Sequence, residues 1–224
     1  MTFSLIAHCP ESGQFGVAAT TAVPAVGKLV AHAWPGIGAV ATQARVNPYL
    51  GIDGIGFLRQ GMDAPTAMKA LLGCDPHPER RQFAVMDKSA RTEAWTGGEC
   101  LDWAGHRTRG GMSVQGNRLT GPHVLVAMEE AFLDTRGEPL AHRLIEALEA
   151  GDDAGGDRKG AVSATIYIVE HEAYPLWDIR VDDHPEPIRE LHRLHDVFAD
   201  RVVPHIRKMP TRRDPGGERC DIDV

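Results

Sequence analysis

The sequence has no long apolar run, no excess of basic residues and no paired cysteine motif, and each absence excludes a class of protein. Its apolar stretches fall short of the roughly 18 to 20 residues that a membrane-spanning helix needs, so we expect no membrane partner. Lys and Arg number 24 against 31 Asp and Glu, which gives a net charge of -7. No overall basic field attracts polyanions, so no nucleic-acid partner is expected.

Cysteines are few and scattered. The chain has Cys9, Cys74, Cys100 and Cys220, with no C-x-x-C pair. This spacing fits neither a zinc ribbon nor the disulfide framework of a small secreted domain, and the short apolar run at the start of the chain lacks the basic region of a signal peptide. We therefore expect reduced thiols and a cytoplasmic protein.

Short apolar and β-branched runs between turn residues predict strands, and longer runs with a period near 3.6 predict helices. Strands are expected at 3–9, 15–21, 28–34, 37–43, 81–87, 91–96, 162–170 and 176–181, with a further short one at 112–115. Helices are expected at 51–60, 65–72, 120–132, 140–148 and 187–201. The Gly- and Asp-rich segment 151–160 is predicted to be a loop.

The order of these elements favours an α+β fold. Strands come in runs and helices follow in runs, which is typical of mainly antiparallel sheets with segregated helices. Strands such as SLIA and GVAAT are apolar or small on both faces, so both faces of each sheet must be covered. A four-layer αββα sandwich meets both demands. We expect one such domain over residues 1–209 and a C-terminal tail over 210–224.

Thr2 directly follows the initiator methionine at the head of the first predicted strand. If Met1 is removed, the hydroxyl and a free α-amine stand on the same residue. An α-amine with a pKa of about 7.7 to 8.0 is an adequate base for that hydroxyl, so one residue supplies both nucleophile and base. The alternative is an ordinary start site, because Met-Thr is a common way for a protein to begin.

Acyl transfer also needs uncharged donors aimed at the developing oxyanion. Gln43 in ATQARVNP and Asn117 in SVQGN lie at predicted strand ends, and Asn47 and Gln115 are near alternatives. The competing interpretation is turn chemistry, since Asn before Pro or after Gly is a routine loop residue.

Other polar residues are candidate substrate contacts. His106, in WAGHRTRGG, stands where it could carry a proton or touch a substrate, although an exposed loop histidine is the commoner case. Asp157 and Arg158, which follow two glycines, are candidates for binding a carboxylate or orienting an amine. A solvent-exposed ion pair between them is the alternative.

The densest set of potential metal ligands is Asp182, Asp183, His184 and Glu186. Neighbouring strand residues face opposite ways, so Asp182 and Asp183 are hard to aim at one ion, and acidic groups are also typical of the lead into a helix. His192 and His195 share a helical face, but the sequence names no third ligand. No metal site is therefore expected.

Several motifs occur together in one order. They are TFSLIA, PESGQFGVA, PAVG, GIGAVATQA, NPYLG, WAGHRT, SVQGN, AGGDRKG and RVDDHPEP, over residues 2–195. Together they resemble the bacterial family of domain of unknown function 1028. That resemblance implies an Ntn-hydrolase-like αββα fold, whose members process amide bonds with an N-terminal Thr, Ser or Cys. It implies no substrate. Family members often place a Ser-Lys pair where this chain has Thr21 and Ala22, so no role of that lysine is carried over.

Two hypotheses of function follow. The first is a homo-oligomeric Ntn-type amidohydrolase that cleaves a small-molecule amide or related C–N bond through Thr2, with no cofactor. The second is a noncatalytic small-molecule-binding or scaffold protein of the same fold, in which Met1 is retained. A metal-dependent hydrolase built around Asp182 is a third interpretation.

Overall fold

The first two strands of the chain pair to form the centre of the larger sheet. β1 (Thr2–Cys9) and β2 (Gln14–Thr21) run antiparallel, with Thr2 opposite Thr21. The turn between them contains Gly13, whose φ of 71° lies in the left-handed region that glycine adopts without steric cost.

Two antiparallel sheets form the body of this computed structural model, which describes residues 2–156 and 159–217. The larger, six-stranded sheet has the order β10-β9-β2-β1-β8-β7, where the four outer members are β7 (Gly105–Arg109), β8 (Met112–Asn117), β9 (Ser163–Val169) and β10 (Trp177–Val181). The four-stranded sheet has the order β3-β4-β5-β6, made of β3 (Ala31–Trp34), β4 (Gly38–Ala44), β5 (Arg81–Asp87) and β6 (Thr92–Thr96).

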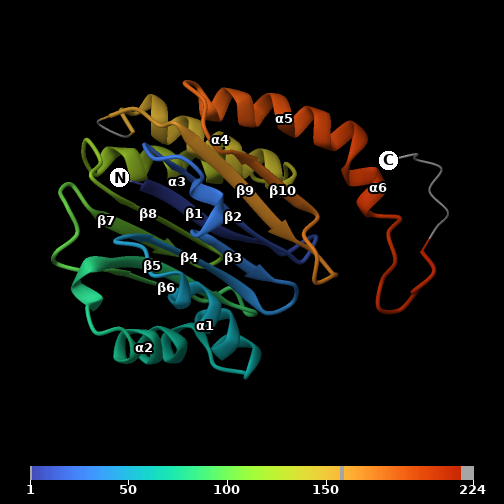
Figure 1. Cartoon of the computed structure of the whole chain (residues 1–224), viewed down its shortest axis with the longest axis horizontal. Helices are drawn as coiled ribbons and strands as arrows, with labels where there is room; N and C mark the ends of the chain where they lie inside the picture. Colours follow the sequence, from blue (N-terminus) through green and yellow to red (C-terminus); the bar gives the residue numbers. More distant parts are fainter. Residues whose placement is uncertain (1, 157–158, 218–224) are drawn as a thin grey trace.

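Helices cover the outer face of each sheet (Figure 1). The six-stranded sheet carries α3 (His123–Asp134), α4 (Leu140–Asp153) and α5 (Pro187–Arg201), and the four-stranded sheet carries α1 (Pro48–Arg59) and α2 (Ala64–Cys74). The described chain also has three short helical turns, η1 (Val26–Lys28), η2 (Pro78–Arg80) and α6 (Val203–Ile206). The expected αββα sandwich is confirmed. No helix in the described part of the chain is long and apolar enough to cross a membrane.

Three apolar cores hold the four layers together. The largest lies between α3, α4 and α5 and the six-stranded sheet, and a second lies between α1, α2 and the four-stranded sheet. The core between the two sheets contains five alanines among its larger apolar residues, namely Ala19, Ala33, Ala39, Ala41 and Ala84. Small side chains let the two sheets approach closely.

Helix starts follow capping chemistry. The Asn47 side chain accepts a hydrogen bond from the Tyr49 N–H at 3.1 Å, and Pro48 occupies the first helical position. This cap starts α1 three residues earlier than the predicted 51. Asp63 caps α2 as expected, accepting from the Thr66 N–H at 3.0 Å.

Some predicted boundaries are wrong. The strand expected at 28–34 begins only at Ala31, because residues 26–28 form η1. The expected stop at Gly73 lies inside α2, and the predicted loop at 151–160 begins as the last turn of α4. Strand β7 was not predicted, because its sequence GHRTR is polar and belongs to the edge of a sheet. The described residues from 210 to 217 form neither helix nor strand.

Candidate active site

The layer between the sheets is apolar over most of its length and polar at one end. Side chains alternate across a strand, so the inward face of β1 carries Thr2, Ser4 and Ile6 in turn. On β4 and β5, Gln43 and Gln82 lie in the same phase as the apolar inward residues. All four polar residues of this set are buried. Burying amides and hydroxyls is costly unless they are hydrogen-bonded, so a group of them marks a specialised site.

A cleft of about 600 Å³ opens at this polar end. Thr2 lies between Thr21 of β2 and Asn117 of β8 in the six-stranded sheet, so the three side chains stand side by side on one face. Gln43 approaches from the opposite sheet and also lines the cleft. The start of the described chain therefore lies at the centre of a sheet and not at its edge (Figure 1).

Thr2 is nearly buried, with 9% of its surface exposed. Its hydroxyl oxygen lies 3.1 Å from the hydroxyl oxygen of Thr21, where either group can donate. Two side-chain amides reach the Thr2 main-chain carbonyl oxygen, Gln43 Nε2 and Asn117 Nδ2, each at 3.4 Å. These are long hydrogen bonds, so both amide groups lie beside Thr2 without being held tightly by it.

Gln82 fixes the orientation of both amides. Its Oε1 accepts from Gln43 Nε2 at 2.8 Å and from Asn117 Nδ2 at 3.0 Å. Its own Nε2 donates to the carbonyl oxygens of Gly116 and Gly105, at 2.8 and 3.0 Å. The sequence analysis did not single out Gln82. The available signal was its position, because it lies in the same alternating phase of β5 as the inward residues Ala84 and Met86.

One buried acceptor at the cleft lacks a partner. Gln43 Nε2 faces three oxygen acceptors, which fixes the orientation of the amide, and Gln43 Oε1 makes no hydrogen bond with any described residue. A buried carbonyl oxygen without a donor costs about 1–3 kcal/mol. This atom is a ready acceptor for an N–H group brought into the cleft.

The backbone around the cleft is strained. Ala25, Ala44 and Arg118 all line it, and their φ angles of 64°, 70° and 57° lie in the left-handed region. That region costs a non-glycine residue about 1–2 kcal/mol. Ala44 directly follows Gln43, and Arg118 directly follows Asn117. Such strain is typical of functional sites, where the surrounding structure holds the unfavourable conformation in place.

Arginines dominate the charge at the mouth of the cleft. The lining includes Arg45, Arg80, Arg118 and one carboxylate, Glu99. Arg80 pairs with Glu99 at 2.8 Å, whereas Arg45 and Arg118 form no ion pair with a described residue. The mouth is thus locally positive in a chain whose net charge is -7.

The other predicted site residues lie at different places. Asn47 caps α1 and donates to Asp75 at 2.8 Å, and it does not line the cleft. Gln115 is fully buried and donates to Ser4 Oγ at 2.6 Å. Asp157 and Arg158 lie outside the described residues.

His106 lies on β7, not in a loop as expected. Its Nδ1 is 2.8 Å from Thr96 Oγ1, which in turn accepts from Gln82 Nε2 at 3.0 Å. This chain of hydrogen bonds links His106 to the amides beside Thr2. The pKa of His106 lies below its ordinary value because burial disfavours the charged ring. The nearby carboxylate of Glu93 raises the pKa, but by less than burial lowers it.

The acidic segment before α5 does not assemble into a metal site. The His184 ring accepts from the Glu186 N–H at 3.0 Å, and the Asp182 carbonyl oxygen accepts from the Ala25 N–H at 2.8 Å. Within the described ranges, this segment brings no three metal-ligating atoms together.

Comparison with known proteins identifies the family. The model of a family of unknown function, DUF1028, matches residues 2–191. The chain belongs to this family. The chain is similar to DUF1028 protein SPO2555 from Silicibacter pomeroyi, whose crystal structure is known, at 31% sequence identity. The alignment covers 96% of this chain and 98% of SPO2555, with a TM-score of 0.88. Anbu (ancestral beta-subunit) from Yersinia bercovieri covers 88% of this chain and 97% of that one at 12% identity, with a TM-score of 0.39, too low to support a conclusion. No curated protein matches this DUF1028 chain.

Proposed function

We propose that this DUF1028 chain is an Ntn-type amidohydrolase that cleaves a small amide or a related C–N bond with Thr2 as nucleophile. The observation that carries the proposal is the position of Thr2. Its hydroxyl stands at the head of a central strand, inside a cleft, with two oriented side-chain amides beside it. The Ntn-hydrolase-like fold implied by the family resemblance is part of the same proposal.

The chemistry needs the α-amine of Thr2 to be free, so Met1 must be removed. The amine then takes the hydroxyl proton while Oγ1 attacks the substrate carbonyl carbon. Gln43 or Asn117 donates an N–H to the oxyanion of the tetrahedral intermediate. When the C–N bond breaks, the protonated amine returns its proton to the leaving nitrogen. Water then hydrolyses the Thr2 ester and releases the acid.

Charge at the cleft mouth favours an anionic substrate. Arg45 and Arg118 carry charges that no described carboxylate neutralises. In a partly enclosed site such charges attract and orient a carboxylate or another anion. We therefore expect amides that carry a negative group to be turned over faster than neutral amides of the same size.

The test is a screen of small amides with N-terminally processed protein. Thr2→Ala should lower turnover at least about 1000-fold, because the nucleophile is lost, whereas Thr2→Ser should retain part of it. The matched control is Thr135→Ala. Thr135 caps the end of α3, far along the chain from Thr2, and its hydroxyl donates to the Ala131 carbonyl oxygen at 2.8 Å. Its turnover should equal that of the wild type.

A second variant separates the hydroxyl from the amine. One residue, lysine, inserted between Met1 and Thr2 keeps the hydroxyl but blocks removal of Met1. The proposal expects this variant to be inactive. Turnover in the inserted variant at the wild-type rate would show that the Thr2 amine is not the base.

The alternative is a noncatalytic binding or scaffold protein of the same fold. The near-complete burial of Thr2, together with the engagement of both amides by Gln82, favours it. It predicts that Met1 is retained in protein from the native host and that Thr2→Ala changes neither turnover nor ligand binding.

A further inference from the structure

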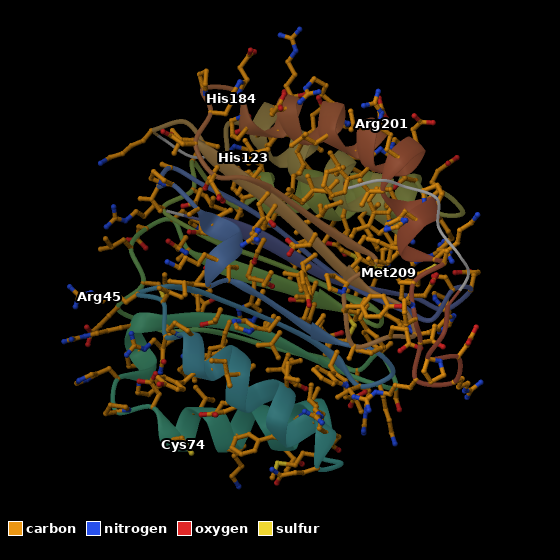
Figure 2. All side chains as sticks on the ribbon, turned by 45° about the vertical axis from the view of Figure 1, so that its right-hand side comes forward. Arg45, Cys74, His123, His184, Arg201 and Met209 are labelled. Atoms are coloured by element: carbon orange, nitrogen blue, oxygen red, sulfur yellow. The ribbon has the colours of Figure 1, made fainter. Side chains whose placement is uncertain are left out.

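Helix α5 packs on the outer side of the six-stranded sheet, beside α4 (Figure 1). Pro187, Ile188 and Leu191 are buried, and Leu194 and Phe198 are partly buried against the same core. The other residues of α5 are partly or fully exposed, and side chains project into solvent near Arg201 (Figure 2). Polar side chains of α5 and α4 therefore meet at the seam between the two helices.

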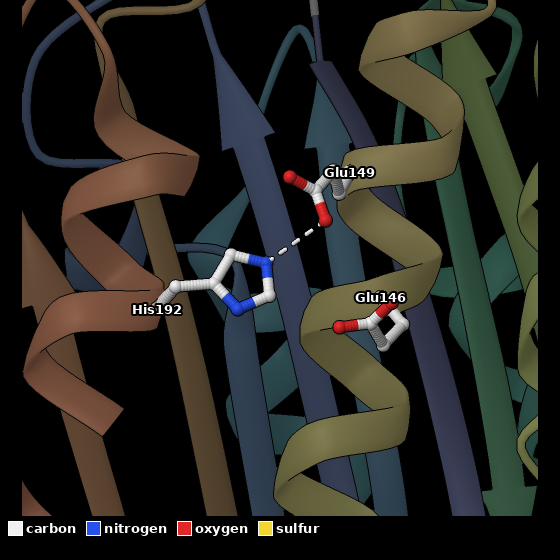
Figure 3. Close-up of side chains that lie close together, drawn as sticks. All are labelled: Glu146, Glu149 and His192. Carbon is white, nitrogen blue, oxygen red and sulfur yellow. Dashed lines mark hydrogen bonds and ion pairs between the residues drawn. The ribbon is translucent and has the colours of Figure 1, made fainter. Parts of the chain in front are cut away.

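Three side chains meet at the seam (Figure 3). His192 points from α5 toward Glu149 and Glu146 of α4, and its Nε2 lies 3.1 Å from Glu149 Oε2. One ligand atom from each residue lies within 4.8 Å of the other two. Glu146 and Glu149 are three apart on one helix, so they share a face by construction.

In the part of the chain that the structure describes, neither carboxylate pairs with a lysine or an arginine. Among the described residues, the ion-pair partners of Glu146 and Glu149 are histidines, His142 and His192 respectively, with no Lys or Arg. Other helical carboxylates of this chain do pair with arginine, as Glu129 does with Arg109. Two carboxylates this close repel each other, and a divalent cation between them would remove the repulsion.

We propose that Glu146, Glu149 and His192 bind a divalent first-row metal ion such as Zn²⁺. An imidazole nitrogen and carboxylate oxygens are ordinary ligands of this ion, at about 2.0–2.2 Å, with water free to complete the tetrahedron. Closing the ligand set needs only rotation of side chains that are partly exposed, with 30% of His192, 47% of Glu149 and 32% of Glu146 accessible. The same exposure gives the ion a path from solvent.

A further histidine lies beside the site. His142 Nδ1 is 3.7 Å from Glu146 Oε1, an ion-pair distance beyond that of a hydrogen bond. The seam lies on the outer helical layer, whereas the Thr2 cleft lies between the sheets. The ion therefore joins α5 to α4 and takes no part in chemistry at Thr2.

The test titrates chelator-treated, dialysed full-length protein with Zn²⁺ by calorimetry and with Co²⁺ by absorption. We expect one saturable equivalent, a cobalt spectrum of nitrogen and oxygen ligation without a thiolate band, and a higher Tm with Zn²⁺. Glu146→Gln, Glu149→Gln and His192→Gln should each weaken binding at least about tenfold. The matched controls are Glu130→Gln and His171→Gln, both exposed and outside the seam, which should bind as the wild type does.

Three results would overturn the site. They are the absence of a saturable equivalent, equal affinity in the three seam variants and the controls, and a thiolate band that assigns the metal to a cysteine. In the first two cases His192 and Glu149 form only an interhelical hydrogen bond. The folding of each variant is checked by measuring its Tm in the presence of chelator. Because the replaced side chains are partly exposed, the Tm of the seam variants should then stay close to that of the control variants.

Discussion

Replacing Gln82 by leucine tests whether the amides beside Thr2 are held by a buried network. Gln82 is fully buried, and its Oε1 is the short-distance partner of both Gln43 Nε2 and Asn117 Nδ2. Gln82→Leu leaves Asn117 Nδ2 with one hydrogen bond of 3.4 Å and Gln43 Nε2 with bonds of 3.3 and 3.4 Å. Each poorly satisfied buried donor costs about 1–3 kcal/mol, so the free energy of unfolding should fall by about 3 kcal/mol.

The assay is urea unfolding followed by circular dichroism, with Tm as a second readout. At about 2–4 °C per kcal/mol for a chain of this length, the Tm should fall by about 6–12 °C. Gln14→Leu is the matched control, because Gln14 is also buried but donates to a single partner, Glu170, at 2.9 Å. It should cost about 1.5 kcal/mol, because Glu170 keeps its contact with Arg207. Equal stability losses in the two variants would refute the network argument.

Three further predictions concern stability elsewhere. Gly97→Ala should destabilise the protein by more than about 2 kcal/mol in urea unfolding, since its Cβ would lie 2.3 Å from the Glu79 carbonyl oxygen, whereas Gly98→Ala should cost far less. Gly56→Ala, whose Cβ would meet nothing within 4 Å in helix α1, should instead add about 0.5–1 kcal/mol, and a loss would contradict this. Burial raises the pKa of the Asp75 carboxyl, but hydrogen bonds from its neighbours outweigh burial and hold that pKa below its ordinary value. The ionised Asp75 carboxylate therefore stabilises the fold above about pH 4, and this stabilisation is lost as the pH falls through the lowered pKa of the folded state. In Asp75→Asn, the free energy of unfolding should fall less steeply between neutral and acid pH than in the wild type.

The layers of the fold were predictable because they depend on pattern. Helix α5 begins and ends where its apolar period predicts, at Pro187 and Arg201, and the hairpin of β1 and β2 follows from alternation and turn residues. Strand β7 was not predictable in the same way. It is an exposed edge strand with the sequence GHRTR, which has no apolar alternation. It becomes a strand because it pairs with the buried strand β8.

The site was predictable only in part, because it depends on which residues of distant strands share a face. Thr2, Gln43 and Asn117 were candidates for their chemistry, and the structure brings them together. Asn47 had the same chemistry, but its neighbour Pro48 makes it a helix cap. The alternation in β5 points Gln82 inward, but the sheet register was needed to show that it lies between the two amides.

The identity of the N-terminal residue in active protein tests the central claim most directly. Protein purified from the native host is screened for turnover of small amides, and the active fraction is analysed by intact-mass spectrometry. The account predicts that the active species begins at Thr2, lighter than the encoded chain by one methionine. Active protein that still carries Met1 would contradict it.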